Sequence, residues 1–361
     1  MRLGIIATHA HPLPSPGHTG DSQLLLDLCW ALNELGHQVT LFAPTGTVAP
    51  AGVSVATCDL DPSGPDWERA VQAGFKGVLN AQDIVHDWSV GKTIARDRQA
   101  EGKPFLATML GGTGYKTALA NTVANSRSMA DRLLRGATDY EGSPTPDLGG
   151  PPSEPFKAVM VAHCGIDTQA YHPAKEHEDW FLWLSRWHPV RGYKQAIQWA
   201  KLTGLPLKMV GEDPRFDHPY QAGCAREAMA LAEGMPNVTF EFLPPGPDHH
   251  EVKRGILRRA KALINPYRFC EPFGLSQIEA MASGVPCLSS ALGSGPEIIS
   301  DGVTGFVAST VEEFAIAARR VNQIDRRTCR AEAVERFDRM VMARNYVRLY
   351  ERVLGGNGWG A

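Results

Sequence analysis

Two glutamates eight positions apart, Glu271 and Glu279, bracket the segment of this sequence most suited to binding a ligand. Pro272 directs Glu271 toward an extended backbone, outside any helix. Gly274 permits a close backbone approach just before a helix that we expect to begin near Leu275. The start of such a helix carries free N–H groups and the positive end of the helix dipole, which together favour an anion. Glu279, about one turn into the helix, is placed to accept hydrogen bonds from paired hydroxyl groups.

An ordinary amphipathic helix would explain part of this pattern. Leu275, Ile278 and Ala282 would form its core face, and Glu279 would be a solvated acid that the helix dipole stabilises by about 0.3–1 kcal/mol. That explanation leaves out Glu271 and the sequence around it, which reads Pro-Phe-Gly-Leu after Glu271 and Glu-Ala-Met-Ala-Ser-Gly-Val-Pro from Glu279 onward. We therefore expect a binding site here rather than a plain surface helix.

This segment resembles the E-x7-E signature of the retaining family-four glycosyltransferases, which have the GT-B fold. In that family the first acid contacts hydroxyls of the donor sugar, and the second holds the ribose of the nucleotide. The resemblance implies these roles for Glu271 and Glu279. It also implies that the backbone amides of Phe273, Gly274 and Leu275 face the sugar and the diphosphate.

Two arginines extend the resemblance upstream. The run from Ser185 to Gly192 is similar to a strand-end pattern in which an arginine, and a lysine five residues later, neutralise the diphosphate. Arg186 takes the first place, and Arg191 stands where a lysine is usual. Because arginine keeps the charge and can bind phosphate through two hydrogen bonds, we expect the role to survive. The alternative is that both arginines are solvated charges in a loop.

Several glycines match the family at other places. Gly211 follows a predicted strand much as the family's next cleft loop does. Gly17 and Gly20 occupy the place of its glycine-rich loop after the first strand, where they would approach the donor phosphate or the acceptor; a plain flexible loop is the alternative. The run Gly165-Ile166-Asp167 resembles the linker between the family's two domains.

Short apolar segments alternate with helical patterns along the chain, which is typical of parallel sheets covered by helices. Asp21 is the expected N-cap of a helix that ends near Leu35. Residues 311–354 are expected to be nearly all helix. The predicted strands lie at residues 3–7, 38–43, 53–57, 84–86, 105–108, 122–124, 158–161, 181–185, 207–210, 238–242, 262–265 and 287–290.

The length of 361 residues exceeds that of one usual core. We expect an α/β protein with two Rossmann-like domains that face a cleft, at residues 1–165 and 166–340, and a terminal helix at about 341–361 packed back on the first domain. Ligands of open α/β sheets bind beyond the carboxyl ends of the strands. The resemblance implies that the donor nucleotide binds mainly on the second domain and the acceptor mainly on the first.

Composition excludes several classes of protein. A net charge of −3 argues against a nucleic-acid binder, and no apolar run has the ~20 residues that span a bilayer. Seven scattered cysteines without a Cys-x-x-Cys pair suggest neither zinc nor disulfides, and with no signal peptide they fit a reducing cytoplasm. Between Arg326 and Leu354 eight arginines stand against four acids. Both a solvated helix face and a weak peripheral contact with anionic lipid stay open.

The resemblance implies a retaining hexosyl- or pentosyltransferase that uses a nucleotide-diphosphate sugar as substrate. The leaving diphosphate would deprotonate the acceptor, so neither a metal nor a cofactor is expected. The acceptor, whether a sugar, a lipid or a small molecule, is not identified. Two alternatives remain: a nucleotide-sugar epimerase or dehydrogenase, which the missing Gly-x-Gly-x-x-Gly disfavours, and a non-catalytic protein that binds sugar nucleotides.

One position departs from the family. A strand of the first domain there typically ends in Pro-x-x-x-Thr-x-His-Gly, and the histidine reaches the donor sugar, often at its 6-hydroxyl. Here the run from Pro104 to Gly111 places Leu110 at the histidine. Leu110 predicts a donor without a 6-hydroxyl, such as a pentose or a 6-deoxyhexose. Alternatively, another residue such as His86 supplies the contact, the alignment is shifted, or activity is weakened or lost.

Overall fold

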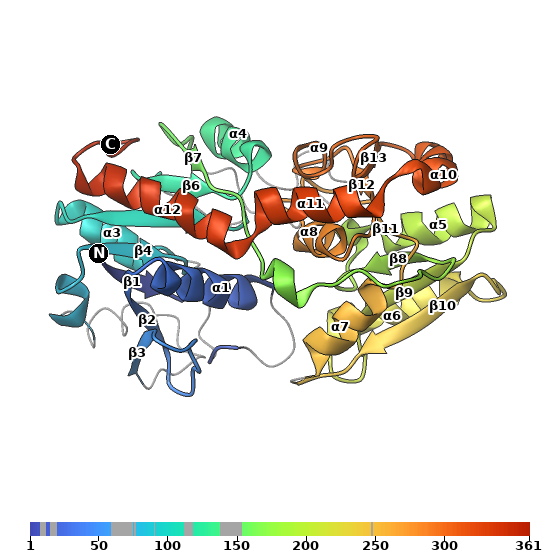
Figure 1. Ribbon diagram of the computed structural model, residues 1–361, viewed down its shortest axis with the longest axis horizontal. Coiled ribbons are helices and arrows are strands. Elements are labelled where there is room, and N and C mark those ends of the chain that lie inside the picture. The colour runs from blue at the N-terminus through green and yellow to red at the C-terminus, as the bar shows by residue number, and fades with distance from the viewer. Residues whose placement is uncertain are drawn as a thin grey trace. The chain divides into compact units, whose positions relative to one another are not determined.

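The structure is a computed structural model that describes residues 1–7, 12–14, 20–58, 75, 77–89, 91–111, 118–137, 154–246 and 248–361. The chain forms two compact units, each built on a parallel sheet. Unit 1 comprises Met1–Thr138, Gly150–Ile166 and Asp338–Ala361, and unit 2 comprises Asp139–Gly149 and Asp167–Phe337. Both termini lie in unit 1 (Figure 1). The two α/β units agree with the predicted fold class.

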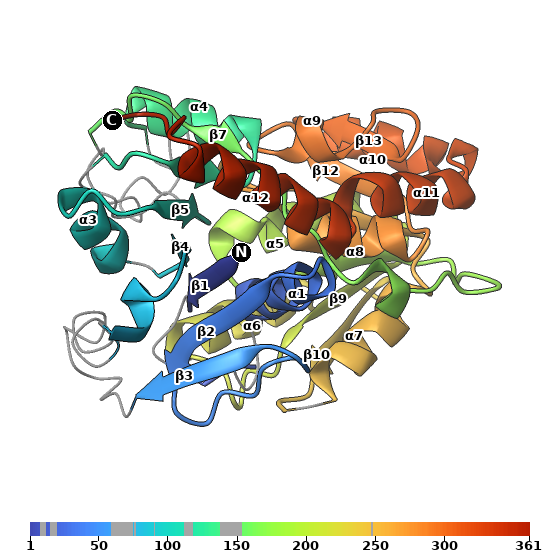
Figure 2. The ribbon, with the colours of Figure 1, turned by 60° about the vertical axis from the view of Figure 1, so that its left-hand side comes forward.

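The sheet of unit 1 has seven strands in the order β3-β2-β1-β4-β5-β6-β7, and every pairing is parallel. Figure 2 shows β3, β2, β1, β4 and β5 in this order across the sheet. Strands β2 and β3 follow on one side of β1, and β4 and the later strands follow on its other side. The point between β1 and β4 is therefore the topological switch point, where open α/β sheets bind ligands. The strands are β1 Arg2–Ile6, β2 Gln38–Pro44, β3 Ser54–Cys58, β4 Ile84–Asp87, β5 Phe105–Met109, β6 Thr122–Ala124 and β7 Met160–Val161.

The described helices of unit 1 include α1 Gly20–Glu34, α3 Thr93–Ala100, α4 Arg127–Arg135 and α12 Arg339–Leu354. Helix α12, from the end of the chain, packs against α1, from its beginning. The prediction that Asp21 caps α1 is wrong, because Asp21 lies inside the first turn of the helix. Its carboxylate still suits the positive end of the helix dipole.

The sheet of unit 2 has six parallel strands in the order β10-β9-β8-β11-β12-β13. The strands are β8 Phe181–Leu184, β9 Leu207–Glu212, β10 Val238–Leu243, β11 Ala262–Asn265, β12 Cys287–Ser290 and β13 Gly305–Ala308. The helices are α5 Tyr193–Thr203, α6 Pro219–Leu231, α7 His249–Leu257, α8 Leu275–Ala282, α9 Gly295–Ile298, α10 Val311–Arg320 and α11 Arg326–Phe337. All residues of β8, β11 and β12 are buried, as expected for central strands covered on both faces.

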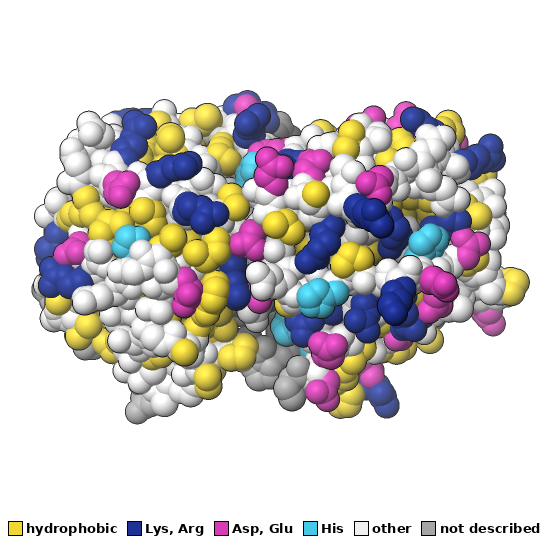
Figure 3. All heavy atoms as spheres, in the orientation of Figure 1, with side chains coloured by type: hydrophobic (Ala, Val, Ile, Leu, Met, Phe, Trp, Pro, Cys, Tyr) yellow, Lys and Arg dark blue, Asp and Glu magenta, His cyan; other side chains and the backbone are white. Residues whose placement is uncertain are grey.

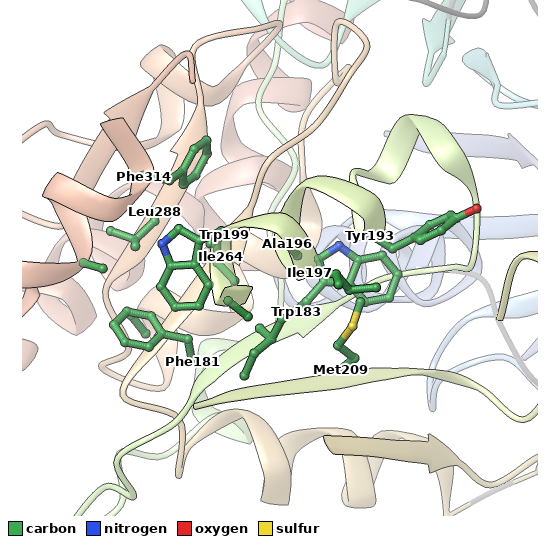
Figure 4. Close-up of a cluster of buried hydrophobic side chains, with 14 of the residues drawn as sticks. Phe181, Trp183, Tyr193, Ala196, Ile197, Trp199, Met209, Ile264, Leu288 and Phe314 are labelled. Carbon is green, nitrogen blue, oxygen red and sulfur yellow. The ribbon is translucent and has the colours of Figure 1, made fainter. Parts of the chain in front are cut away.

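Large aromatic side chains fill the core of unit 2. Figure 4 shows Phe181 of β8 beside Trp199 of α5, with Trp183 and Met209 from neighbouring strands in the same cluster. The rings of Phe181 and Trp199 meet edge to face, 4.8 Å between centroids. Such contacts add about 0.5–1.5 kcal/mol beyond the area that they bury. A rigid core of this kind holds the strand ends of unit 2, where the predicted site residues lie.

Candidate functional site

The candidate site of unit 2 forms where two loops meet at the switch point of its sheet. Strands β8 and β11 are neighbours although two strands separate them in the sequence. The loop after β8 carries Arg186 and Arg191, and the loop after β11 leads to Glu271. Because parallel neighbours end at the same edge, the topology brings these side chains together.

Glu271 and Arg191 form an ion pair across these loops. Their side chains are 8% and 19% exposed, so the pair is largely shielded from solvent. The Arg191 guanidinium also lies over the ring of Phe269, 4.9 Å from its centroid, and 5.7 Å from that of Tyr267. Arginine suits such a place because its planar group both stacks on rings and binds oxyanions.

Two glycines let the backbone close around this pair. Gly192 has a φ of +76°, and a Cβ there would lie 2.0 Å from the carbonyl oxygen of Pro266. Gly293 has a φ of +67°, and a Cβ there would lie 2.3 Å from the amide nitrogen of Glu271. The next residue, Ser294, donates its amide to the carbonyl of Glu271 and its hydroxyl to that of Phe273. The turn after β12 therefore fixes the segment that carries Glu271.

Helix α8 begins as the sequence predicted. Gly274 is its N-cap in the left-handed conformation, with φ 87° and ψ 65°, and no side chain caps the helix. A Cβ on Gly274 would lie 2.4 Å from the amide nitrogen of the buried Gln277 side chain, so the position requires glycine. Phe273 is buried against Phe337, and Leu275 is half-buried as the first helical residue. This arrangement leaves the first amides of α8 without a side-chain acceptor, which suits an anion.

Glu279 lies on α8 with its side chain 8% exposed. Its Oε1 accepts hydrogen bonds from Lys253 Nζ at 2.6 Å and from the Tyr171 hydroxyl at 2.9 Å. Both contacts use the same oxygen. The ammonium group of Lys253 offsets the cost of burying the carboxylate.

A cavity of about 170 Å³ lies beside the Arg191–Glu271 pair. Its lining includes Arg186, His188, Arg191 and Phe269. Burial lowers the pKa of His188, and the charges of Arg191 and Arg186 lower it further. The histidine is therefore neutral near pH 7, and the two arginines supply the positive charge of the cavity.

Gly211 allows close packing of the Trp187 side chain. A Cβ there would lie 2.6 Å from the Trp187 indole nitrogen, which donates to the carbonyl of Glu212. The pKa of the Glu212 carboxyl is raised to about 7, first by burial and then by Asp217, against the opposing effect of Lys253 and Arg186. Glu212 Oε2 lies 3.7 Å from His249 Nδ1. Near neutral pH this carboxyl can therefore carry or release a proton beside the site.

Three of the predicted site residues, Gly17, Gly20 and Leu110, belong to unit 1. Gly17 lies outside the described residues, and Gly20 is the first residue of α1 rather than part of a loop. Leu110 directly follows β5 and is half-buried, and its carbonyl accepts a hydrogen bond from Asn125 at 3.3 Å.

His86 does not fit the alternative in which it reaches the donor sugar. Its ring is 1% exposed and bonds to the hydroxyls of Thr108 at 2.6 Å and Tyr350 at 2.7 Å. The indole of Trp88 also donates to it, at 3.1 Å. Burial, and the charge of Lys92, hold the pKa of His86 well below its usual range. This histidine belongs to the core of unit 1.

Sequence reasoning missed Lys253 and Tyr171, the two partners of Glu279. Lys253 stands in the charged run Glu-Val-Lys-Arg, which looks like a solvated helix face. Tyr171 follows the predicted linker and carries no pattern that points to a site. Both pairings depend on tertiary contacts between distant elements, which local patterns do not encode.

Within the part of the chain that the structure describes, no three His, Cys, Asp or Glu side chains gather as metal ligands would. None of the described helices combines the length and apolarity that crossing a membrane requires. Independence from metals remains a prediction.

Known proteins resemble this chain in sequence. Residues 182–323, within unit 2, match the family model described as "Glycosyl transferases group 1". The D-inositol 3-phosphate glycosyltransferases of Mycobacterium tuberculosis and Mycobacterium bovis are 28% identical, over 85% of this chain and 72% of theirs. These matches cover the candidate site and both units.

Solved structures share the fold over nearly the whole chain. AviGT4, a glycosyltransferase involved in avilamycin A biosynthesis, superposes with a TM-score of 0.70 at 21% identity and covers 99% of both chains. A sucrose-phosphate synthase from Thermosynechococcus elongatus gives 0.75 at 18% identity, with 98% of this chain and 99% of that chain covered. Taken with the family model and the curated relatives, they support a family-four-like glycosyltransferase of the GT-B fold, with a group 1 glycosyltransferase domain in unit 2.

Proposed function

We propose that this chain is a retaining glycosyltransferase that takes its sugar from a nucleotide-diphosphate donor bound mainly by unit 2. One observation carries the proposal most directly. Glu271 and Glu279 are both nearly buried, stand on either side of an uncapped helix start, and are each matched by a basic side chain from another element. Buried acids are costly, and a binding role explains why two are kept here.

The proposed roles follow from the chemistry of the groups. Arg186 and Arg191 line the cavity and would neutralise the diphosphate as it leaves. The first amides of α8 would bind a phosphate oxygen, and Glu271 would accept hydrogen bonds from sugar hydroxyls. Glu279 has an oxygen, Oε2, outside its contacts with Lys253 and Tyr171, and this atom would hold the ribose hydroxyls.

In the proposed reaction the bond between the anomeric carbon and the diphosphate oxygen breaks as the acceptor oxygen bonds to the same face of that carbon. The departing diphosphate takes the proton of the acceptor hydroxyl. The protein therefore supplies positioning and electrostatic stabilisation rather than a base of its own. Neither a metal nor a cofactor enters the proposed step.

The relatives suggest the first substrates to test. The structure of HepE from Anabaena, which has a TM-score of 0.72 at 14% identity with 97% of this chain and 100% of that chain covered, was solved in complex with UDP. The curated relatives are named for inositol 3-phosphate. UDP and its sugars are thus the first donors to try, and inositol 3-phosphate is the first acceptor, while unphosphorylated sugars and lipids complete the panel.

The first experiment identifies the nucleotide and tests Glu279 together. A thermal-shift screen of nucleoside diphosphates selects the base, because a bound ligand raises the melting temperature. The affinity of the selected diphosphate is then measured by calorimetry for the native chain, Glu279→Ala and the matched control Glu233→Ala, which changes an exposed acid of the same unit. Loss of a hydrogen bond to a charged group should weaken binding by about 10- to 100-fold in Glu279→Ala only.

Three results would count against the proposal. Equal affinity of the Glu279→Ala and Glu233→Ala chains would remove Glu279 from the nucleotide site. A product with inverted anomeric configuration by NMR would contradict the retaining mechanism. Donor binding without turnover on any acceptor would favour the non-catalytic alternative that Leu110 raises.

A further inference from the structure

A groove of about 530 Å³ lies on unit 1, and none of the residues assigned to the proposed reaction lines it. Helix α12 forms one wall with Asn345, Arg348, Leu349 and Arg352. These positions follow the spacing of three, four and seven residues that places side chains on one face of a helix. Figure 3 shows basic side chains with apolar ones between them over the part of unit 1 where Figure 1 places α12.

The rest of the lining comes from the edge of the sheet. Met160 and Val161 are the whole of β7, the last strand in the order, and both are half-buried. Arg127, the first residue of α4, and His163, just after β7, also line the groove. The groove thus has an apolar floor and cationic or polar walls.

The charged residues known to line this groove are basic. Arg127, Arg348 and Arg352 line it, and none of the described residues of its lining is an Asp or a Glu. The acid nearest in sequence on α12, Glu351, is exposed and is not part of the lining. Arg348 and Arg352 place like charges on one wall of the groove, and an anion in the groove would be attracted by both.

Two of the arginines are held in place by neutral groups. Arg352 donates its Nε to the carbonyl of Asn357 at 2.8 Å and lies over the ring of Trp359, 5.7 Å from the centroid. Arg348 donates to the Asn345 side chain at 3.4 Å. The partners in these contacts are neutral, so the contacts do not neutralise the guanidinium groups and leave their charge to attract a ligand.

We propose that this groove binds a small soluble molecule that carries a phosphate and an apolar body. Arg348 and Arg352 bind the phosphate from one wall and Arg127 from the other, while Met160, Val161 and Leu349 contact the body. The volume is that of a small-molecule site, which typically spans about 300–1,000 Å³. Because every lining residue belongs to unit 1, the site is separate from the arginine cavity of unit 2.

Phenyl phosphate is a suitable probe, because it joins one phosphate to one apolar ring. Its affinity is measured by calorimetry for the full chain, for Arg348→Gln/Arg352→Gln and for Arg344→Gln. Arg344 is the matched control: it is exposed on the same helix, one turn before Arg348, and does not line the groove. We expect the double variant to bind about tenfold or more weakly and the control to bind as the native chain does.

The arginine cavity of unit 2 could also bind this probe, so the titration is repeated on an Arg186→Ala/Arg191→Ala chain. Binding that persists there and is lost on adding Arg348→Gln/Arg352→Gln supports the groove. Binding abolished by Arg186→Ala/Arg191→Ala alone would overturn the proposal. So would equal affinity for phenol, which lacks the phosphate.

Lipid headgroups of a membrane also carry phosphate, so binding to a membrane must be distinguished from binding of a small soluble molecule. Sedimentation with vesicles of phosphatidylcholine and phosphatidylglycerol is compared for the native chain and the Arg348→Gln/Arg352→Gln variant. Vesicle binding that needs these arginines, together with no affinity for phenyl phosphate, would assign the groove to lipid and overturn the proposal. Melting curves of each variant verify that it is folded.

Discussion

At the scale of single residues, Arg191 and Arg186 are predicted to share one task, yet their surroundings differ. Arg191 is paired with the buried carboxylate of Glu271, whereas Arg186 is exposed in the same loop. If both charges are aimed at the diphosphate, as the sequence predicts, removing either one should slow transfer more than it reduces stability. The ion pair changes that expectation for Arg191, because its removal leaves a buried acid without its cation.

We therefore expect different results for the two substitutions. Arg191→Ala should lower the free energy of unfolding by about 1–3 kcal/mol as well as weaken donor binding, because Glu271 loses a charged partner. Arg186→Ala should change stability by less than about 0.5 kcal/mol, as is usual for an exposed position, and should still weaken diphosphate binding. Urea unfolding and calorimetry with the selected nucleotide measure the two effects. If Arg186→Ala keeps full affinity for the diphosphate, Arg186 is only a solvated loop charge.

Leu110 gives the second prediction at this scale. If its side chain faces the donor sugar, a 6-hydroxyl placed against it loses a partner, and an unsatisfied buried hydroxyl costs about 1–3 kcal/mol. Turnover should therefore be higher with a pentose or 6-deoxyhexose donor than with the 6-hydroxylated sugar on the same nucleotide. Leu110→His should reduce or reverse that preference. A native preference for the 6-hydroxylated donor would contradict the prediction, and the core position of His86 removes one other source of the contact.

The sequence could predict those parts of the candidate site whose residues lie close together along the chain. Glu271, Gly274 and Glu279 lie within one short segment, and the structure places them at the start of α8 as expected. Lys253 and Tyr171 reach Glu279 from distant parts of the chain, and only the folded sheet brings them together. The pairing of Arg191 with Glu271 was also not foreseen, although the position of each was.

At the scale of elements, the strands were predictable because each is a short apolar run between turn residues. All twelve predicted strands begin and end within two residues of the observed ones, such as β11 at Ala262–Asn265. The strand predicted at 158–161 is shorter in the structure, since only Met160–Val161 pairs with β6. Strand β13, Gly305–Ala308, was missed because its glycine and short length made it look like a loop.

Gly274 provides the prediction for elements. In Gly274→Ala, a Cβ must fit a φ of +87° and a contact with Gln277, so we expect a loss of about 1–3 kcal/mol of stability and weaker diphosphate binding. The matched control is Gly223→Ala, inside α6, where a Cβ would meet nothing within 4 Å. That change should stabilise the chain by up to about 1 kcal/mol, because alanine favours helix over glycine. Unchanged stability and affinity in Gly274→Ala would show that α8 does not need its left-handed start.

At the scale of the whole molecule, the end of the chain completes the unit in which the chain begins. Helix α12 packs on α1, and its Tyr346 and Tyr350 lie against His86 in the core of unit 1. Trp359 continues this role by donating to the carbonyl of Thr122 in β6. The return of the terminal helix was expected from the resemblance, while the buried polar contacts that hold it depend on side chains that no local pattern selects.

The hydrogen bonds of His86 define its protonation and lead to the last prediction. An indole N–H can only donate, so the Trp88 contact makes His86 Nδ1 an acceptor, and Nε2 then donates to Thr108. The Tyr350 hydroxyl also donates to Nδ1.

Tyr350→Phe should therefore lower the free energy of unfolding by about 0.5–1.5 kcal/mol, because one buried hydrogen bond is lost while the Trp88 contact remains. Hydrogen exchange followed by mass spectrometry should show faster exchange in β4, β5 and α12 but not in α8, since the change lies within unit 1. Tyr220→Phe, at an exposed position in unit 2, is the control and should leave both regions unchanged. Equal exchange of α12 in the native and Tyr350→Phe chains would mean that apolar packing alone holds this helix on unit 1.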